Sequence, residues 1–456
     1  MPRPTLDIAV VGTGIAGLSA AWQLSRHHRV TVFEQADWTG GHANTRHVSL
    51  DGRDTAVDTG FIVYNERNYP NFVALLRHLD TPTQASNMSF AVSLDGGRLE
   101  YSSDAPCGLF GQRRNIARPR FWSMLADLRR FYAAAPADLA AGALVGQSLG
   151  QYLSRGDYGR AFVEDHLLPM GAAIWSSSAE DMRAYPAEAF VRFFESHGLL
   201  ELRNRPAWRT VSGGSRAYVD RLTAPFNDRI HRNLGVTRIS RQASGVAITD
   251  SAGRRHGFDH AVIATHADEA LRLLDDPSAD ERALLGAIPY TRNHTYLHKD
   301  PTLMPRRRSV WSSWNYVTAS GAARTAPNAP PQVSYWLDRL QDLDTREDVF
   351  ITLNPTVAPA ASRTLATFAY DHPMFDTGAL AAQPELWSLQ GARNTWFCGS
   401  YFGYGFHEDA LQAGLAVGEA LGGYDRPWSV PDPSGRIHVG RSRVTAFAPE
   451  HAMAAE

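Results

Sequence analysis

The stretch LDIAVVGTGIAG, residues 6–17, decides the fold of this chain. An apolar strand runs into three glycines that open a helical pattern, which is the order of a dinucleotide-binding unit. Gly12 lets the strand turn sharply, Gly14 removes a Cβ so that a pyrophosphate can approach the backbone, and Gly17 lets the helix pack close to the sheet. The helix N-terminus, with its unpaired N–H groups, favours the negative charge of the phosphates.

An acidic residue completes this unit. Glu34 follows the apolar run 30–33, about 20 residues after the first glycine, where its carboxylate can accept ribose hydroxyls. Because strand, glycines, helix and acid occur in order, we expect an ADP-containing dinucleotide without a 2′-phosphate. The predicted contacts in this region also include Ile15, Ala16 and Gln35.

The composition is that of an ordinary globular protein. The 456 residues are 44% hydrophobic and 20% charged, so we expect a large core and two domains. A formal net charge of -2 gives no reason to expect nucleic acid as a partner. Cys107 and Cys398 predict neither a disulfide framework nor a metal site, and a reducing cytoplasm fits. Asp7 interrupts the apolar run near the N-terminus, so we expect no export signal.

The pattern along the chain predicts an α/β fold, a Rossmann-like FAD/NAD(P)-binding domain with an inserted α+β substrate domain. Helical spacing prevails from 106 to 205, and short β-branched runs return at 236–239, 246–249 and 261–264. We assign 1–80, 206–288 and 385–425 to the FAD/NAD(P)-binding domain, 81–205 and 289–384 to the substrate domain, and 426–456 to a C-terminal tail.

Further segments resemble the flavin amine oxidase and phytoene desaturase superfamily. After the acid comes a glycine pair, Gly40 and Gly41, which lies beside the FAD pyrophosphate in that superfamily; His42 stands where the family usually has arginine. The segment DTGFIVY, residues 58–64, is similar to the one that passes the isoalloxazine ring. The resemblance implies flavin contacts from Thr59, Gly60 and Phe61.

Two more segments extend the resemblance toward the C-terminus. Val236 and Ala264 match the returning half of the nucleotide site, and CGSYFGYGFHEDAL, residues 398–411, resembles the segment that closes over the flavin. Ser400 stands where the family normally carries an acid. The resemblance implies that a helix N-terminus points at the flavin and stabilises its reduced anion. The contacts implied here are Gly399, Ser400, Phe406, His407 and Ala410.

The segments GGHANT, DTGFIVYNERNYPNF, AAIWS, SWNY, TLNP and YGFHED are similar to a bacterial subgroup of predicted NAD/FAD-binding proteins associated with modified fatty-acid enzymes. The resemblance implies an FAD-dependent oxidoreductase with non-covalent FAD, and some relatives are thought to dehydrogenate fatty acyl chains. No second GxGxxG follows another strand, so we expect no separate NAD(P)H domain. Oxygen or a carrier would then reoxidise the flavin.

The reaction class depends on one lysine. Amine oxidases of the superfamily usually hold a water at flavin N5 with a lysine, whose position falls near Asn293 by our alignment; the sole lysine of the chain is Lys299. This favours dehydrogenation or desaturation of a fatty acyl or other apolar substrate over amine oxidation. A redox-neutral flavin isomerase and a non-catalytic flavin-binding protein stay open. The predicted catalytic residues are His407, Tyr64 and Asn293, and further acid/base candidates are Tyr370, His372 and Tyr404.

Aromatic residues are the candidate walls of the substrate pocket, although such residues are more often core. They are Trp175, Phe190, Trp311, Trp314, Tyr335 and Trp336. A basic and aromatic helical region could touch an anionic membrane, or it is a solvated surface. It contains Arg113, Arg114, Arg118, Arg120, Arg129 and Arg130 with Phe121, Trp122, Phe131 and Tyr132. We expect a cytoplasmic protein with a small-molecule or lipid substrate, and we predict no oligomeric state.

Overall fold

A five-stranded parallel sheet carries the glycine turn. The structure is a computed structural model that describes residues 4–104, 107–201, 205–319, 330–422 and 424–440. Each neighbouring pair in this sheet is parallel, which confirms the predicted Rossmann-like α/β fold. The strands, in spatial order, are β10 (Ile230–His231), β2 (Arg29–Phe33), β1 (Asp7–Val11), β14 (His260–Ile263) and β20 (Thr395–Phe397).

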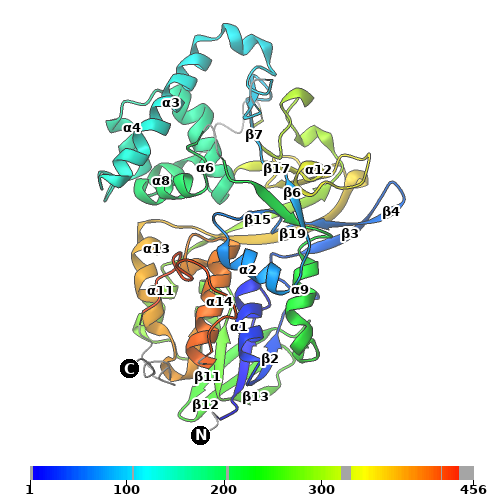
Figure 1. The fold of residues 1–456 in the computed structure, drawn as a ribbon, viewed down its shortest axis with the longest axis vertical. Helices are drawn as coiled ribbons and strands as arrows, with labels where there is room; N and C mark the ends of the chain where they lie inside the picture. The colour runs from blue at the N-terminus through cyan, green and yellow to red at the C-terminus, as the bar shows by residue number, and fades with distance from the viewer. Residues whose placement is uncertain (1–3, 105–106, 202–204, 320–329, 423, 441–456) are drawn as a thin grey trace, which may run out of the picture.

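Two helices from opposite ends of the chain pack side by side on this sheet, α1 (Ile15–Leu24) and α14 (His407–Gly422) (Figure 1). Glycines permit this close packing. A Cβ on Gly17 would lie 2.1 Å from the carbonyl oxygen of Gly12, and one on Gly414 would lie 2.1 Å from that of Ala16. The N-terminal glycine unit and the C-terminal helix therefore form one structural body.

Further elements surround the parallel sheet. An antiparallel sheet contains β11 (Val236–Gln242), β12 (Gly245–Asp250) and β13 (Arg255–Phe258). The helices of this part are α2 (Pro70–His78), α9 (Arg216–Thr223), α10 (Ala267–Leu273), α11 (Ala279–Leu285) and α13 (Thr377–Ala382). Residues 424–440 pack back onto α1 and α2, since Trp428 stacks on Trp22 of α1 and contacts the ring of His78 on α2. Residues 441–456 of the predicted tail lie outside the described residues.

A seven-stranded sheet forms the second large layer (Figure 1). Its pairs are antiparallel except for β16 with β7. The strands, in spatial order, are β19 (Thr364–Pro373), β15 (Tyr290–His298), β18 (Phe350–Leu353), β17 (Gln332–Trp336), β16 (Trp314–Val317), β7 (Phe90–Leu94) and β8 (Leu99–Ser102). The small sheets contain β3 (Thr45–Leu50) with β4 (Arg53–Asp58), and β5 (Tyr64–Asn65) and β6 (Thr83–Ser86) on either side of β9 (Trp208–Val211).

A helical group lies beside the seven-stranded sheet, at the opposite end of the molecule from β11, β12 and β13 (Figure 1). It comes from the region in which helical spacing was predicted. Its helices are α3 (Pro119–Ala140), α4 (Leu149–Arg155), α5 (Arg160–Phe162), α6 (Leu168–Trp175), α7 (Ala179–Ala184) and α8 (Ala187–Ser196), and a π-helical turn, η2 (Val163–Leu167), joins α5 to α6. The short helix α12 (Leu337–Gln341) follows β17.

Candidate functional site

One large cavity connects the parallel sheet, the seven-stranded sheet and the helical group. Its volume is about 1300 Å³, and its lining runs from the glycine turn after β1 to side chains of α3, α6 and α8. Pockets for a single small ligand span roughly 300–1,000 Å³. The cavity therefore has room for a large cofactor together with a substrate.

The glycine turn shapes one end of this cavity. Gly12 has a φ of +101°, and a Cβ there would lie 2.8 Å from the carbonyl oxygen of Ala264, so the turn excludes other residues. A Cβ on Gly14 would meet nothing within 4 Å. Gly41, with a φ of +58°, would place a Cβ 2.9 Å from the Cα of Gly14. The two glycine segments thus pack against each other and leave open space where phosphates are predicted.

Glu34 is already bound by the protein at this end. Its Oε2 accepts hydrogen bonds from the backbone N–H of Thr13, at 2.9 Å, and from the hydroxyl of Thr13; its Oε1 accepts from the backbone N–H of Ala36 at 2.8 Å. A carboxylate offers about four lone-pair positions. One position on Oε1 is left for a ribose hydroxyl, where the sequence predicted contacts to both hydroxyls.

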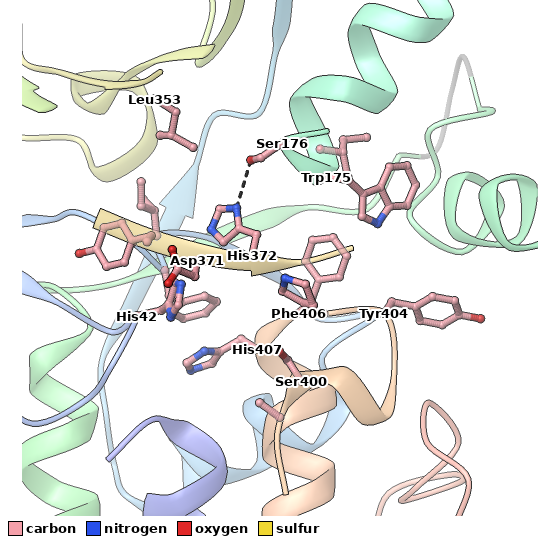
Figure 2. Close-up of a pocket in the computed structure, with 18 of the residues that line it drawn as sticks. His42, Trp175, Ser176, Leu353, Asp371, His372, Ser400, Tyr404, Phe406 and His407 are labelled. Atoms are coloured by element: carbon pink, nitrogen blue, oxygen red, sulfur yellow. Dashed lines mark hydrogen bonds between the residues drawn. The ribbon is translucent and has the colours of Figure 1, made fainter. Parts of the chain in front are cut away.

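The N-terminus of α14 forms another wall (Figure 2). The ring of His407 stacks on Phe61, with 3.7 Å between ring centroids, and its Nε2 lies 2.8 Å from the hydroxyl of Tyr218. Burial lowers the pKa of His407 to about 3. His407 is therefore neutral at neutral pH and held in one orientation beside the predicted flavin contacts.

A second group of imidazoles lies between the two large layers. His372 on β19 lies between Ser176 and His407 in Figure 2, and its Nδ1 is 3.1 Å from the Ser176 hydroxyl. The His42 ring lies 4.9 Å from that of Tyr370 and 5.6 Å from that of His372. Burial lowers the pKa of His372 to about 4, and burial with the neighbouring histidines holds the pKa of His42 well below its usual value. The imidazoles of His42 and His372 are therefore neutral at neutral pH.

The cavity brings together almost all the predicted cofactor contacts. Those that line it are Gly12, Gly14, Ile15, Ala16, Glu34, Gln35, Gly40, Gly41, His42, Thr59, Gly60, Phe61, Val236, Ala264, Gly399, Ser400, Phe406, His407 and Ala410. Gly17 is absent from the lining because it packs against Gly12. These residues remain predicted FAD contacts. The prediction requires that they lie on one cavity, and they do.

The predicted catalytic residues are divided. His407 lines the cavity, as do the candidates Tyr370, His372 and Tyr404, whereas Tyr64 and Asn293 do not. Tyr64 is buried against Tyr69 and Phe72. The Asn293 amide donates to the carbonyls of Thr291 and Tyr370, at 3.0 and 3.3 Å, and accepts from Asn354 at 2.8 Å. Asn293 therefore connects backbone strands, and its neighbour Arg292 lines the cavity.

The other end of the cavity is mainly apolar. The predicted walls Trp175, Trp314 and Tyr335 line it, but the prediction is wrong for Phe190, Trp311 and Trp336, which pack inside hydrophobic clusters. Sequence reasoning missed several further lining residues because they come from separate elements: Met88, Phe90, Leu109, Met124, Leu125, Leu128, Met170, Ile174, Leu340, Ile351 and Leu353. It also missed His266, Arg292 and Asp371.

The predicted basic and aromatic region is not one open face. Phe121 and Phe131 are buried. Arg120 pairs with Asp165 at 2.7 Å, and Arg130 pairs with Asp127 at 2.8 Å. Arg118 donates to the carbonyl of Arg98 and to two side-chain oxygens. The exposed apolar side chains are Trp122, which is 49% exposed, and its neighbour Ile116, which is 56% exposed.

Three features of this structure fit a bound FAD. Gly14 leaves open space at the N-terminus of α1, Glu34 keeps an acceptor position, and Nε2 of His42 is buried with no hydrogen-bond partner among the described residues. A parallel sheet with this turn, and a second helix N-terminus on the same cavity, define an FAD-binding protein of the Rossmann type. More particularly, the chain belongs to the flavin-containing amine oxidoreductase family, whose model matches residues 15–295.

Known proteins agree with this membership. The chain is 28% identical over 256 residues to AofH of Mycobacterium tuberculosis, named as a flavin-containing monoamine oxidase; the match covers 56% of this chain and 55% of that protein, about half its length. Cyclohexylamine oxidase from Brevibacterium oxydans IH-35A has a TM-score of 0.65 at 16% identity and covers 92% of this chain and 100% of its own. The CLA-producing fatty acid isomerase from P. acnes has a TM-score of 0.63 at 16% identity, and the match covers 90% of this chain and 97% of the isomerase chain. These two structures share the fold.

Proposed function

We propose that the chain is an FAD-dependent oxidoreductase that dehydrogenates or desaturates an apolar substrate, a fatty acyl chain or another lipid. The observation that carries the proposal is the wall of the cavity beyond the predicted flavin contacts, which is formed mainly by aliphatic and aromatic side chains. The sole lysine, Lys299, pairs with Glu347 at 2.9 Å, and neither residue lines the cavity. No lysine is therefore available at the flavin.

The proposed reaction removes a hydride from one carbon and a proton from its neighbour, which leaves a double bond. FAD, when bound, supplies the hydride acceptor at N5. The chain has to exclude water, align the C–H bond and accept the proton. Burial keeps the imidazoles of His42, His372 and His407 neutral, and all three line this cavity, so they are the candidate proton acceptors. Of the predicted catalytic residues, His407 is the one whose position supports a direct role.

Amine oxidation is the second candidate, and one observation favours it. The carboxylate of Asp371 lines the cavity, and its buried Oδ1 accepts no hydrogen bond within the described residues. Such an oxygen could hold an ammonium group. However, Nε of Arg292 lies 3.9 Å from the same oxygen, so the negative charge already faces a cation. We therefore place amine oxidation second, with a redox-neutral isomerase and a non-catalytic flavin-binding protein behind it.

A lipid substrate taken from a membrane would require contact with the membrane surface. Within the described residues, no helix combines the length and the hydropathy needed to cross a bilayer. We propose peripheral contact through a lipid-facing patch, defined as exposed Ile116 and Trp122 with Arg113 and Arg114. Exposed aromatic and basic side chains together favour the interface of an anionic bilayer.

Anaerobic mixing tests the proposed function. Fatty acyl lipids should bleach the flavin absorbance of the loaded protein, whereas primary and secondary amines should leave it oxidised. Bleaching by an amine with no response to any acyl lipid would replace the proposal by amine oxidation. Movement of a double bond without bleaching would indicate the isomerase, and bound flavin that no compound reduces or uses would indicate the non-catalytic protein.

A further inference from the structure

Among the residues that the structure describes, four arginines line the cavity, and they differ in their partners. Arg272 pairs with Asp268 at 2.6 Å, and Arg292 faces Asp371. Arg129 has no hydrogen bond or ion pair among the described residues. Arg205 donates its Nε to a backbone carbonyl, that of Glu201, at 2.8 Å, and has no carboxylate partner among the same residues.

The two arginines without a carboxylate lie where the cavity opens. Both are exposed to solvent and also line the cavity. Arg129 lies on α3 one turn from Tyr132, another lining residue, and the charge of Arg205 opposes protonation of His166 and favours ionisation of Tyr132. All four of these residues line the cavity.

A buried imidazole accompanies this pair. His166 is 7% exposed and lines the cavity; its Nδ1 lies 3.0 Å from the hydroxyl of Tyr101, and its Nε2 has no hydrogen-bond partner among the described residues. Unpaired buried polar atoms are costly, so an uncompensated ring nitrogen on a cavity indicates a ligand contact.

The apolar path beside these groups follows α3. Met124, Leu125 and Leu128 line the cavity on the same helix as Arg129 and Tyr132. From Met124 to Arg129 a helix rises about 7.5 Å, the length of several methylene groups in an extended chain. A ligand that fits this geometry combines an alkyl chain with a charged end group.

We propose that Arg129 and Arg205 bind the oxyanion head group of the substrate, a carboxylate or a phosphate, while its alkyl chain lies along α3. This inference rests on the proposed function, because it names the end of the acyl substrate that stays away from the flavin. Guanidinium groups match planar oxyanions with two parallel hydrogen bonds, and a charged partner strengthens each bond.

Calorimetry on the FAD-loaded protein tests the head-group site with four ten-carbon probes: decanoate, decyl phosphate, decanol and decylamine. The two anions should bind about tenfold more tightly than decanol. Tighter binding of decanoate identifies a free fatty acid, and tighter binding of decyl phosphate identifies a phosphate-bearing lipid; both results support the oxyanion site. Equal affinities for decanol and the anions, or tightest binding of decylamine, would overturn it.

Four variants sharpen this test. Arg129→Gln and Arg205→Gln should each raise the dissociation constants of the two anions roughly fivefold to tenfold. The dissociation constant of decanol should change by no more than about twofold. The control is Arg160→Gln, since Arg160 is 81% exposed, pairs with Glu164 and does not line the cavity; an equal loss in this variant would contradict the proposal. The double change to glutamate, Arg129→Glu with Arg205→Glu, should reverse the preference toward decylamine.

Failure of this proposal is distinguishable from failure of the proposed function. Arginine-dependent binding of decanoate without flavin bleaching would support the head-group site and count against dehydrogenation. If acyl lipids bleach the flavin but their affinity is unchanged in both arginine variants, dehydrogenation would be supported and the head-group site overturned.

Discussion

Replacing Glu34 with alanine should weaken FAD binding by an amount that the structure limits. Three protein donors, the N–H and hydroxyl of Thr13 and the N–H of Ala36, occupy three of about four acceptor positions. One charge-assisted bond to the ribose is therefore lost, worth about 1.5–3 kcal/mol. This corresponds to a dissociation constant raised about 10- to 150-fold.

Thr13→Val is the matched control for this change. The Thr13 hydroxyl donates to Glu34 and accepts from the N–H of Gly40 at 3.2 Å, so its loss disturbs the same loop while the carboxylate remains. The dissociation constant is measured by titrating apoprotein with FAD, and the free energy of unfolding by denaturant. We expect both variants to lose stability, but Thr13→Val to stay within about threefold of wild type in FAD affinity.

The same two measurements contain the refuting result. An unchanged dissociation constant for Glu34→Ala, or equal losses in both variants, would show that the carboxylate supports the loop and does not contact the ribose.

Three further predictions concern the cofactor, the histidines and the membrane. Acid denaturation should release FAD into the supernatant, because binding is non-covalent; a yellow pellet would contradict this. Burial lowers the pKa of His372 to about 4, below the usual 6.5 or so, so the unfolded chain binds the proton first as pH falls. Between about pH 6.5 and 4 the free energy of unfolding of the wild type should therefore fall by up to about 3 kcal/mol more than that of His372→Asn, as measured by denaturant unfolding. Equal pH dependence of the two proteins would refute the buried neutral ring. Arg113→Ser with Trp122→Ser should reduce sedimentation with anionic vesicles at low salt, whereas Val357→Ser, at a 72% exposed control position, should not; wild type that fails to sediment would rule out the lipid-facing patch.

The sequence was most informative where the chemistry depends on backbone. Gly12, Gly17 and Gly41 occupy positions where a Cβ would collide or φ is positive, so their requirement is visible in the residue type itself. The parallel sheet follows from the same segment because apolar strand, turn and helix are adjacent in the chain.

Side-chain direction on the distant strands was not predictable. Asn293 pairs with Tyr370 across β15 and β19, and its amide bonds to the strands, while the next residue, Arg292, lines the cavity. A shift of one residue moves a side chain to the other face of a strand, and alignment at a remote turn does not resolve such a shift.

The aromatic walls show a second limit. Trp311 and Trp336 pack edge to face, 5.5 Å apart, and Trp311 packs against Phe350, whereas Trp314 lines the cavity three residues away. Core and cavity wall require the same apolar surface, so residue type does not separate them. Only the tertiary packing decides which aromatic residues belong to the core and which line the cavity.

A single-turnover measurement tests the central claim most directly. The FAD-loaded protein is mixed without oxygen with a saturated fatty acid, and both the flavin absorbance and the chain are analysed. The account predicts one carbon–carbon double bond formed for each flavin reduced. An intact fatty acid with oxidised flavin, together with stoichiometric flavin reduction by a primary amine, would contradict it.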